Sequence, residues 1–393
     1  MEQQEEETQI KRRRKDSSVS KLTSSFPHDL ISEILLRLPA KSVKRFGCVS
    51  RLWSSITTDA YFITSFETRP QRKSLLLCFR RGENLFAFSI PQDHSNEPFS
   101  VSSQPVATYH TTCPKNSPFY PNKSVHGLIC SKKKTKAIIW NPRAKHLLTL
   151  TKPQKSWTWN HIKFFLGYDP IGRKHKVVCM RWIVACDECW VLTLGSAQES
   201  WRVVKTYHEH HLYNNRDSYE CINGVLYYQA YLIHNQTVII MSFDVRSEKF
   251  HMIKLQLENI TGDGTLRTYN GRLAFHLRHG LTLWTLEDAE KHDWSPIQFP
   301  GSTIDSLDQR LGKKLNFTGI TDAGELVYVP AGLGQSFYVM YYDPKRKSSH
   351  VVEHKGIADE EFRLKHGFGN RSLYKFHIVL NHTESLMSLL QIC

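Results

Sequence analysis

The residues best suited to chemistry are a cysteine pair and a histidine group in the middle of the chain. Cys186 and Cys189 have the spacing of a zinc knuckle or a redox pair. His208, His210 and His211 follow about 20 residues later, and four such soft ligands are able to hold Zn²⁺ tetrahedrally.

The local sequence argues against both roles. Cys186 and Cys189 fall at an expected strand-to-strand turn, and no second Cys-x-x-Cys pair supports a metal site. A redox thiol needs a lowered pKa, typically at a helix N-terminus, and no helix is expected here. Gly332 and Gly334 precede no helix either, so they indicate a turn and not a phosphate cradle.

No nucleophile elbow or paired-carboxylate pattern appears among the histidine, aspartate and glutamate residues. We therefore expect no metal, no cofactor and no catalytic residue. Trp157 and Trp159 are candidate ligand anchors, with packing at a strand edge as the alternative.

The composition is that of a soluble globular chain, with 40% hydrophobic and 23% charged residues. No apolar run reaches the roughly 18 residues of a membrane span, so no membrane partner is expected. Nine scattered cysteines form no disulfide framework, which favours the nucleus or cytoplasm. The net charge of +15 suits an acidic partner or nucleic acid, but no RNA-binding or zinc-finger signature is present, so no specific nucleic acid is expected.

Residues 1–23 are too polar to bury a core and predict a disordered basic tail. Its basic run fits a nuclear import signal, with a solvated charge run as the alternative. The run consists of Lys11, Arg12, Arg13, Arg14 and Lys15.

The elements that follow are of two kinds. In residues 24–66, apolar residues recur with helical spacing, as in Leu30, Ile34 and Leu38, and predict three short helices. Pro39 ends the first helix, because the residue before a proline is forced out of the helical region. Three helices in about 40 residues enclose little core, so some of these apolar side chains should await a partner.

This segment, PHDLISEILLRLPAKSVKRFGCVSRLWSSI, resembles an F-box. The resemblance implies docking to a Skp-type adaptor and, through it, to a cullin scaffold. The residues that match the family's adaptor-binding positions are Pro27, Leu30, Ile34, Leu35, Leu38, Pro39, Val43, Phe46, Val49 and Trp53. The alternative for part of this set is a role in holding the three helices together.

From residue 70 to 390 the sequence predicts an all-β domain. Apolar runs of four to seven residues alternate with Gly, Asn, Asp and Pro turns. Asn-Gly hairpins, as at Asn223 and Asn270, alternate with hairpins that turn on an aspartate, as at Asp244 and Asp343. Paired, they give four-stranded units of roughly 40–50 residues, which is typical of β-propeller blades.

We expect six blades, with five or seven as alternatives and an irregular β-sandwich as the alternative fold. Strands from 74–90 and 372–382 should share the closing blade. The fold class is thus α+β, a helical module followed by an all-β domain.

This region resembles the plant F-box-associated interaction domain of type 3. The resemblance rests on GLICSKKKTKAIIWNPRAKHLLTL, FFLGYDPIGRKHKVVCM, SFDVRSEKFHMIKL and LWTLEDAEKHDWSPIQF. One position departs from the family pattern, because Leu166 stands where Phe precedes Gly-Tyr.

Together the two resemblances imply a non-catalytic, substrate-recognition subunit of an SCF-type (Skp-cullin-F-box) ubiquitin ligase that recruits an unknown target protein. The alternatives are a Skp-binding regulator that acts without ubiquitin transfer, a propeller enzyme and a nucleic-acid-binding protein.

Overall fold

The computed structural model describes residues 27–389, with gaps at 93–98, 103–106, 114–118, 122, 145, 154–161, 183–185, 197–199, 214–218, 236, 256–263, 278–281, 299–314, 333–336, 356, 358–359 and 369–375. The basic run Lys11–Lys15, Trp157 and Trp159 lie outside the described residues. The chain divides into two compact units, Met1–Pro70 and Gln71–Cys393. None of the described helices combines the length and apolarity that crossing a bilayer requires.

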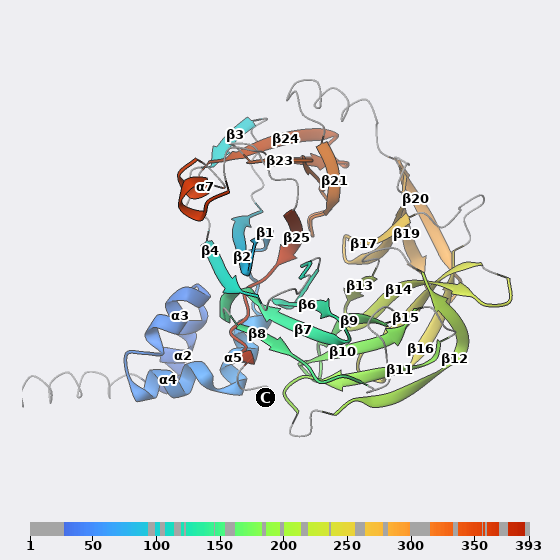
Figure 1. Cartoon of the computed structure of the whole chain (residues 1–393), viewed down its shortest axis with the longest axis horizontal. Helices are drawn as coiled ribbons and strands as arrows, with labels where there is room; N and C mark the ends of the chain where they lie inside the picture. Colours follow the sequence, from blue (N-terminus) through green and yellow to red (C-terminus); the bar gives the residue numbers. More distant parts are fainter. Residues whose placement is uncertain are drawn as a thin grey trace, which may run out of the picture. The chain divides into compact units, whose positions relative to one another are not determined.

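The first unit contains four helices in its described part: α2 (His28–Leu36), α3 (Ala40–Phe46), α4 (Arg51–Thr58) and α5 (Ala60–Thr68) (Figure 1). Pro27 and Pro39 precede α2 and α3, as the sequence predicted. Three helices were expected, and α5 is an addition. It begins where Asp59 Oδ1 accepts hydrogen bonds from the N–H groups of Tyr61 and Phe62, which caps the helix.

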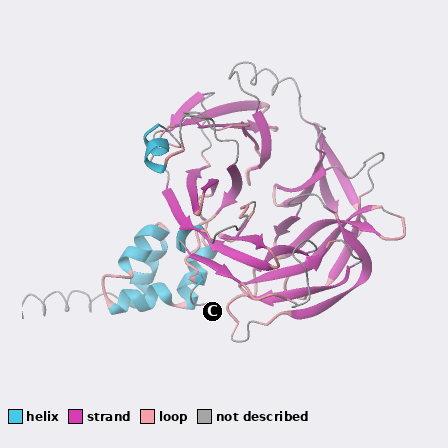
Figure 2. Cartoon of the chain, in the orientation of Figure 1, coloured by secondary structure: helices cyan, strands magenta, loops and turns pink. Residues whose placement is uncertain are grey.

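The second unit consists almost entirely of strands (Figure 2). Two sheets hold its first strands. One has the order β25 (Phe376–His382), β1 (Ser74–Arg81), β2 (Asn84–Pro91) and β4 (Ala107–Thr112); the next has β5 (Ser124–Val125), β6 (Leu128–Lys133), β7 (Lys136–Asn141) and β8 (His146–Thr149). A 3₁₀ turn, η1 (Pro142–Ala144), joins β7 to β8.

The third sheet has eight strands: β9 (Ile162–Asp169), β10 (Lys174–Arg181), β11 (Cys186–Thr193), β12 (Arg202–Leu212), β13 (Tyr219–Ile222), β14 (Val225–Leu232), β15 (Val238–Asp244) and β16 (Phe250–Lys254). The fourth has β17 (Gly264–Tyr269), β18 (Arg272–Leu277), β19 (Thr282–Asp288) and β20 (Asp293–Gln298). The fifth has β21 (Leu315–Ile320), β22 (Leu326–Pro330), β23 (Phe337–Asp343), β24 (Ser348–His354) and β3 (Phe99–Ser102).

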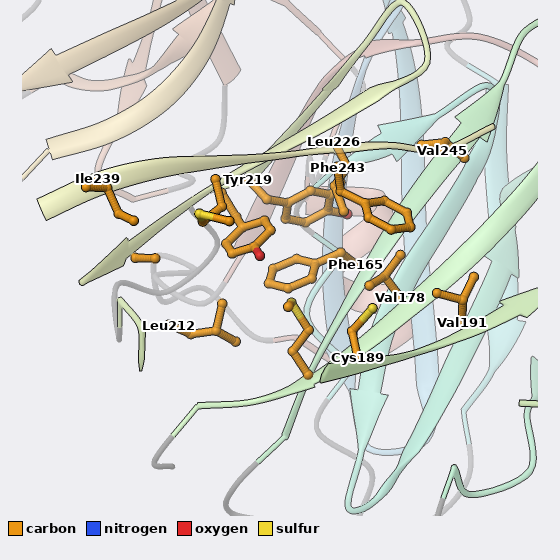
Figure 3. Packing of buried hydrophobic residues seen from close by; sticks show 14 residues of the cluster. Phe165, Val178, Cys189, Val191, Leu212, Tyr219, Leu226, Ile239, Phe243 and Val245 are labelled. Carbon is orange, nitrogen blue, oxygen red and sulfur yellow. The ribbon is translucent and has the colours of Figure 1, made fainter. Parts of the chain in front are cut away.

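The expectation of six separate blades is corrected by this arrangement, because the described strands form five sheets. β9–β12 and β13–β16 are each four-stranded, but β12 is long enough for its end to pair with β14, at His210 with Leu232. Turn spacing predicts strand pairs within a hairpin and says nothing of such a pairing between units. The core of this sheet lies between its two halves, where Phe165 and Val178 meet Leu226 and Phe243 (Figure 3).

Hydrophobic clusters join each sheet to the next around a closed ring. They contain Trp140 (first and second sheets), Tyr168 (second and third), Phe275 (third and fourth), Tyr328 (fourth and fifth) and Phe337 (fifth and first). Because each sheet is covered on both faces, its strands are continuous apolar runs. In β1, Leu75 and Leu77 face the fifth sheet while Leu76 and Cys78 face the second. Sheets joined in a closed ring form a β-propeller, which excludes the alternative fold, an irregular β-sandwich.

The ring closes where the two ends of the unit meet. β1 pairs antiparallel with β25, with Leu77 opposite Ile378 and Phe79 opposite Phe376. The prediction that these segments share a sheet is confirmed. His382 continues the closure, because its Nδ1 lies 2.8 Å from Ser124 Oγ beside β5.

The turns have the chemistry that the sequence indicates. Asn223 and Gly224 have φ values of 48° and 84°, which fits a type I′ hairpin between β13 and β14. The aspartate turns are also confirmed: Asp343 Oδ1 accepts from the N–H groups of Lys345 and Arg346 at 2.8 and 3.2 Å.

The sequence did not predict every element of this unit, and α7 (Glu360–His366) and β3 are among those it missed. The helix α7 packs Phe362 against Phe79 and Phe88 of the first sheet. Strand β3 pairs in parallel with β24, far along the chain.

Two buried histidines predict how stability depends on pH. Burial lowers the pKa of His382 to about 3, and lowers that of His175 to about 3 despite its hydrogen bond to the Val125 carbonyl. In the unfolded chain the pKa returns to roughly 6.5, so the unfolded state binds protons that the folded state excludes. This contribution to stability is complete above about pH 6.5 and is lost as the pH falls toward 3.

We expect the free energy of unfolding, measured with urea at a series of pH values, to fall below pH 6.5 by up to about 1.4 kcal/mol per pH unit for each histidine. The variant His382→Asn should show a shallower fall. A profile that does not change between pH 7 and pH 4 would contradict this account.

Candidate partner-binding surfaces

Helix α2 has apolar residues on two sides. Ile31 and Leu35 are buried, whereas Leu30 and Ile34 are 50% and 51% exposed. Leu30 and Ile34 stand four residues apart and are therefore neighbours on the helix surface. A helix that serves only its own small core would carry a single apolar stripe.

Further apolar residues of the predicted adaptor face are accessible. Val49, between α3 and α4, is 64% exposed, and Pro27 and Pro39 are exposed as well. Leu38, Phe46 and Trp53 are half-buried, and the rings of the last two lie 5.0 Å apart. Eight of the ten predicted residues are thus at least partly accessible; whether they bind an adaptor stays a prediction.

Leu35 and Val43 differ from the other eight, because both side chains are fully buried. Their burial fits the alternative that part of the set holds the helices together. Each faces inward from its helix together with the other buried apolar residues of the unit: Ile31, Ala40, Ile56, Phe62 and Phe66. The helical period predicts which residues are apolar but does not tell which of two apolar sides is covered. Tyr61, 76% exposed on α5, was not foreseen.

Cys186 and Cys189 lie within strand β11 and not at the strand-to-strand turn that the sequence predicted. Cys186 and His210 are register partners on β11 and β12. His210 is buried, its Nδ1 lies 2.7 Å from the His208 carbonyl oxygen, and its Nε2 lies 3.0 Å from the Tyr228 hydroxyl. Burial lowers the pKa of His210, which keeps it neutral. Within the described ranges, no three His, Cys, Asp or Glu residues gather as metal ligands.

Around the ring axis, a polar network ties three inner strands together. Lys123, just before β5, forms an ion pair with Glu220 of β13, and Glu220 Oε2 accepts from the Thr268 hydroxyl of β17 at 3.3 Å. Both charged side chains are mostly buried. Because the carboxylate is already held by two partners, this network is a cross-link of the ring rather than a site for a ligand.

A small helical module with exposed apolar residues, followed by a closed ring of β-sheets, defines a β-propeller protein with an N-terminal helical module. Residues 23–64 match the F-box domain, and residues 74–383 match the F-box associated beta propeller domain. The chain belongs to the family of F-box proteins that carry this propeller domain.

Relatives with similar sequences match this chain along almost its whole length. A putative F-box protein of Arabidopsis thaliana is 50% identical over 398 residues, covering 99% of this chain and 100% of the relative. Two further putative F-box proteins of Arabidopsis thaliana are each 44% identical, again over 99% of this chain and 100% of the relative. Among solved structures, a chain of the nidogen/laminin complex matches with a TM-score of 0.42 and 11% identity, over 80% of this chain and 99% of that chain.

The two sides of α2 predict different responses to mutation. Leu35→Ala should lower the free energy of unfolding of the helical unit by about 2–5 kcal/mol, because it empties a buried site. Leu30→Ala should change it by less than about 0.5 kcal/mol, because an exposed side chain loses little contact. Urea unfolding followed by the helical circular dichroism signal measures both. Equal losses would show that Leu30 is part of the core.

Proposed function

We propose that this chain is the target-recruiting subunit of an SCF-type ubiquitin ligase. The observation that carries the proposal is the F-box match over residues 23–64 together with the exposed Leu30 and Ile34 on α2. A Skp-type adaptor would cover these side chains and link the chain to a cullin scaffold. Burying apolar side chains contributes roughly 1.5–3 kcal/mol each, which makes a few of them sufficient anchors.

The propeller would hold the target. Its sheets are locked to one another by buried clusters, so the connections between strands are carried by a rigid scaffold, as recognition loops generally are. The chain itself makes or breaks no bond in this proposal. It would act by proximity, because a target held beside a ubiquitin-loaded enzyme reacts at a high effective concentration.

The basic run Lys11–Lys15 supports nuclear import, so we propose that the chain acts in the nucleus, in the cytoplasm or in both.

Co-purification with a Skp-type adaptor tests the first half of the proposal. The double variant Leu30→Ala, Ile34→Ala should no longer bind the adaptor. In the wild-type chain the adaptor would bury both side chains, and the variant removes this apolar contact. Tyr61→Ala is the control, since Tyr61 is even more exposed, at 76%, but lies outside the predicted adaptor face. Loss in the double variant alone supports the proposal, and failure of the wild-type chain to bind contradicts it.

A second measurement separates recruitment from regulation. Proteins captured by the wild-type chain should have longer half-lives in cells that carry only the double variant. Unchanged half-lives, with adaptor binding intact in the wild type, would indicate a regulator that acts without ubiquitin transfer.

A further inference from the structure

The positive charge of the chain is concentrated in one part of the propeller. Residues 124–181 contain thirteen Lys and Arg residues and a single acidic residue, Asp169. Residues 182–393 contain 21 Lys and Arg residues and 24 Asp and Glu residues. One arc of the ring, from β5 to β10, therefore carries an excess of positive charge that the remainder lacks.

Strands β6 to β10 lie side by side (Figure 1). The bounds and register of these strands put six of the basic residues at or just beyond strand ends on one side. We name this set the β6–β10 basic surface: Lys132, Lys134, Lys136, Lys152, Lys163 and Arg181.

Strand pairing and one side-chain hydrogen bond bring members of this surface together. Lys136 begins β7, and Lys152 lies next to it because the Leu150 N–H bonds to the Ala137 carbonyl. Lys132 Nζ donates to the Ile162 carbonyl of β9 at 2.6 Å, and Arg181 stands opposite Ile162 in β10.

Elsewhere on the propeller, lysine and arginine side chains are neutralised by ion pairs. Lys176 and Arg202 share Glu248, and Arg272 pairs with Glu287. By contrast, Lys134, Lys136 and Lys152 are exposed and take part in no ion pair within the described ranges. Lys132 satisfies its ammonium group with a backbone carbonyl, which leaves its positive charge uncompensated.

An unneutralised group of lysines attracts polyanions and orients their approach. Proteins that hold single-stranded nucleic acid add exposed aromatic rings on which bases stack. In the described part of this arc no Phe, Tyr or Trp is exposed. Tyr120, just before β5, is exposed, but it lies against His377, with ring centres 5.2 Å apart. The nearby Trp182 and Trp201 are half-buried. As far as the described residues form it, the surface offers charge without exposed stacking rings, which fits acidic side chains on a flexible polypeptide better than it fits bases.

We infer that the β6–β10 basic surface captures an acidic segment of the target protein. This inference rests on the proposed function, because it assigns the target a chemistry and a place on the propeller. Acidic residues of the target would pair with Lys134, Lys136 and Lys152, and the attraction would weaken as salt screens it.

The test uses the full chain co-purified with a Skp-type adaptor, and two labelled probes of equal length, an oligoglutamate peptide and an oligouridine RNA. The variant Lys134→Gln, Lys136→Gln, Lys152→Gln removes three charges from the surface. The control Lys249→Gln, Lys345→Gln, Lys347→Gln removes three exposed charges elsewhere on the propeller. Both variants thus have the same net charge.

We expect the surface variant to raise the Kd for the peptide by about tenfold or more, as three lost charge pairs would do, and the control by less than about threefold. Equal effects of the two variants would overturn the inference, because net charge alone would then explain binding. Tighter binding of the RNA, lost in the surface variant, would also overturn it in favour of nucleic acid. Both variants should retain the adaptor, so failure of the inference is distinct from failure of adaptor docking.

Discussion

The pairing of β1 with β25 is the constraint on which the second unit depends. It joins Leu77 to Ile378 across almost the full length of the propeller, so the first sheet is complete only when the last strand is in place. The apolar residues of β1 then have a covered sheet on each side, and Val379 of β25 is buried between them. Contacts this distant in sequence are slow to form and cost loop entropy, which the clusters between sheets must offset.

This closure also determines where partners can bind. With sheet faces buried against each other, the accessible parts are turns, strand ends and the outermost strands. The lysines of the β6–β10 basic surface lie at such strand ends, and the aspartate turns lie at others. The helical unit differs in what it exposes, because the apolar side chains of Leu30 and Ile34 on α2 are accessible to solvent. One unit is thus closed and presents polar ends, and the other is open and presents apolar side chains.

The sequence predicts local features of this structure well. Asn223-Gly224 and Asp343 form the expected turns because their backbone preferences act within a few residues. The helix from His28 to Leu36 follows from its apolar spacing and the flanking prolines. Both families were also apparent from short motifs, since these motifs combine turn residues with core residues.

Features that depend on distant residues were not predictable. The pairing of His210 with Leu232, which merges two units into one sheet, and the parallel pairing of β3 with β24 have no local signal. The burial of Leu35 and Val43 depends on how four helices pack, and α5 was itself missed. The concentration of lysines between residues 124 and 181 is visible in the sequence. That these lysines stand at strand ends on one side is not, because it depends on how β6 packs beside β9, where Lys132 contacts Ile162.

The central claim is that the two units bind different partners, and hydrogen exchange measured by mass spectrometry tests it most directly. The full chain would be compared with and without a Skp-type adaptor. We expect the adaptor to slow exchange in residues 27–58, across α2, α3 and α4, and to leave residues 74–383 unchanged. Slowed exchange in the strands of the propeller, or none in α2, would contradict this division of roles.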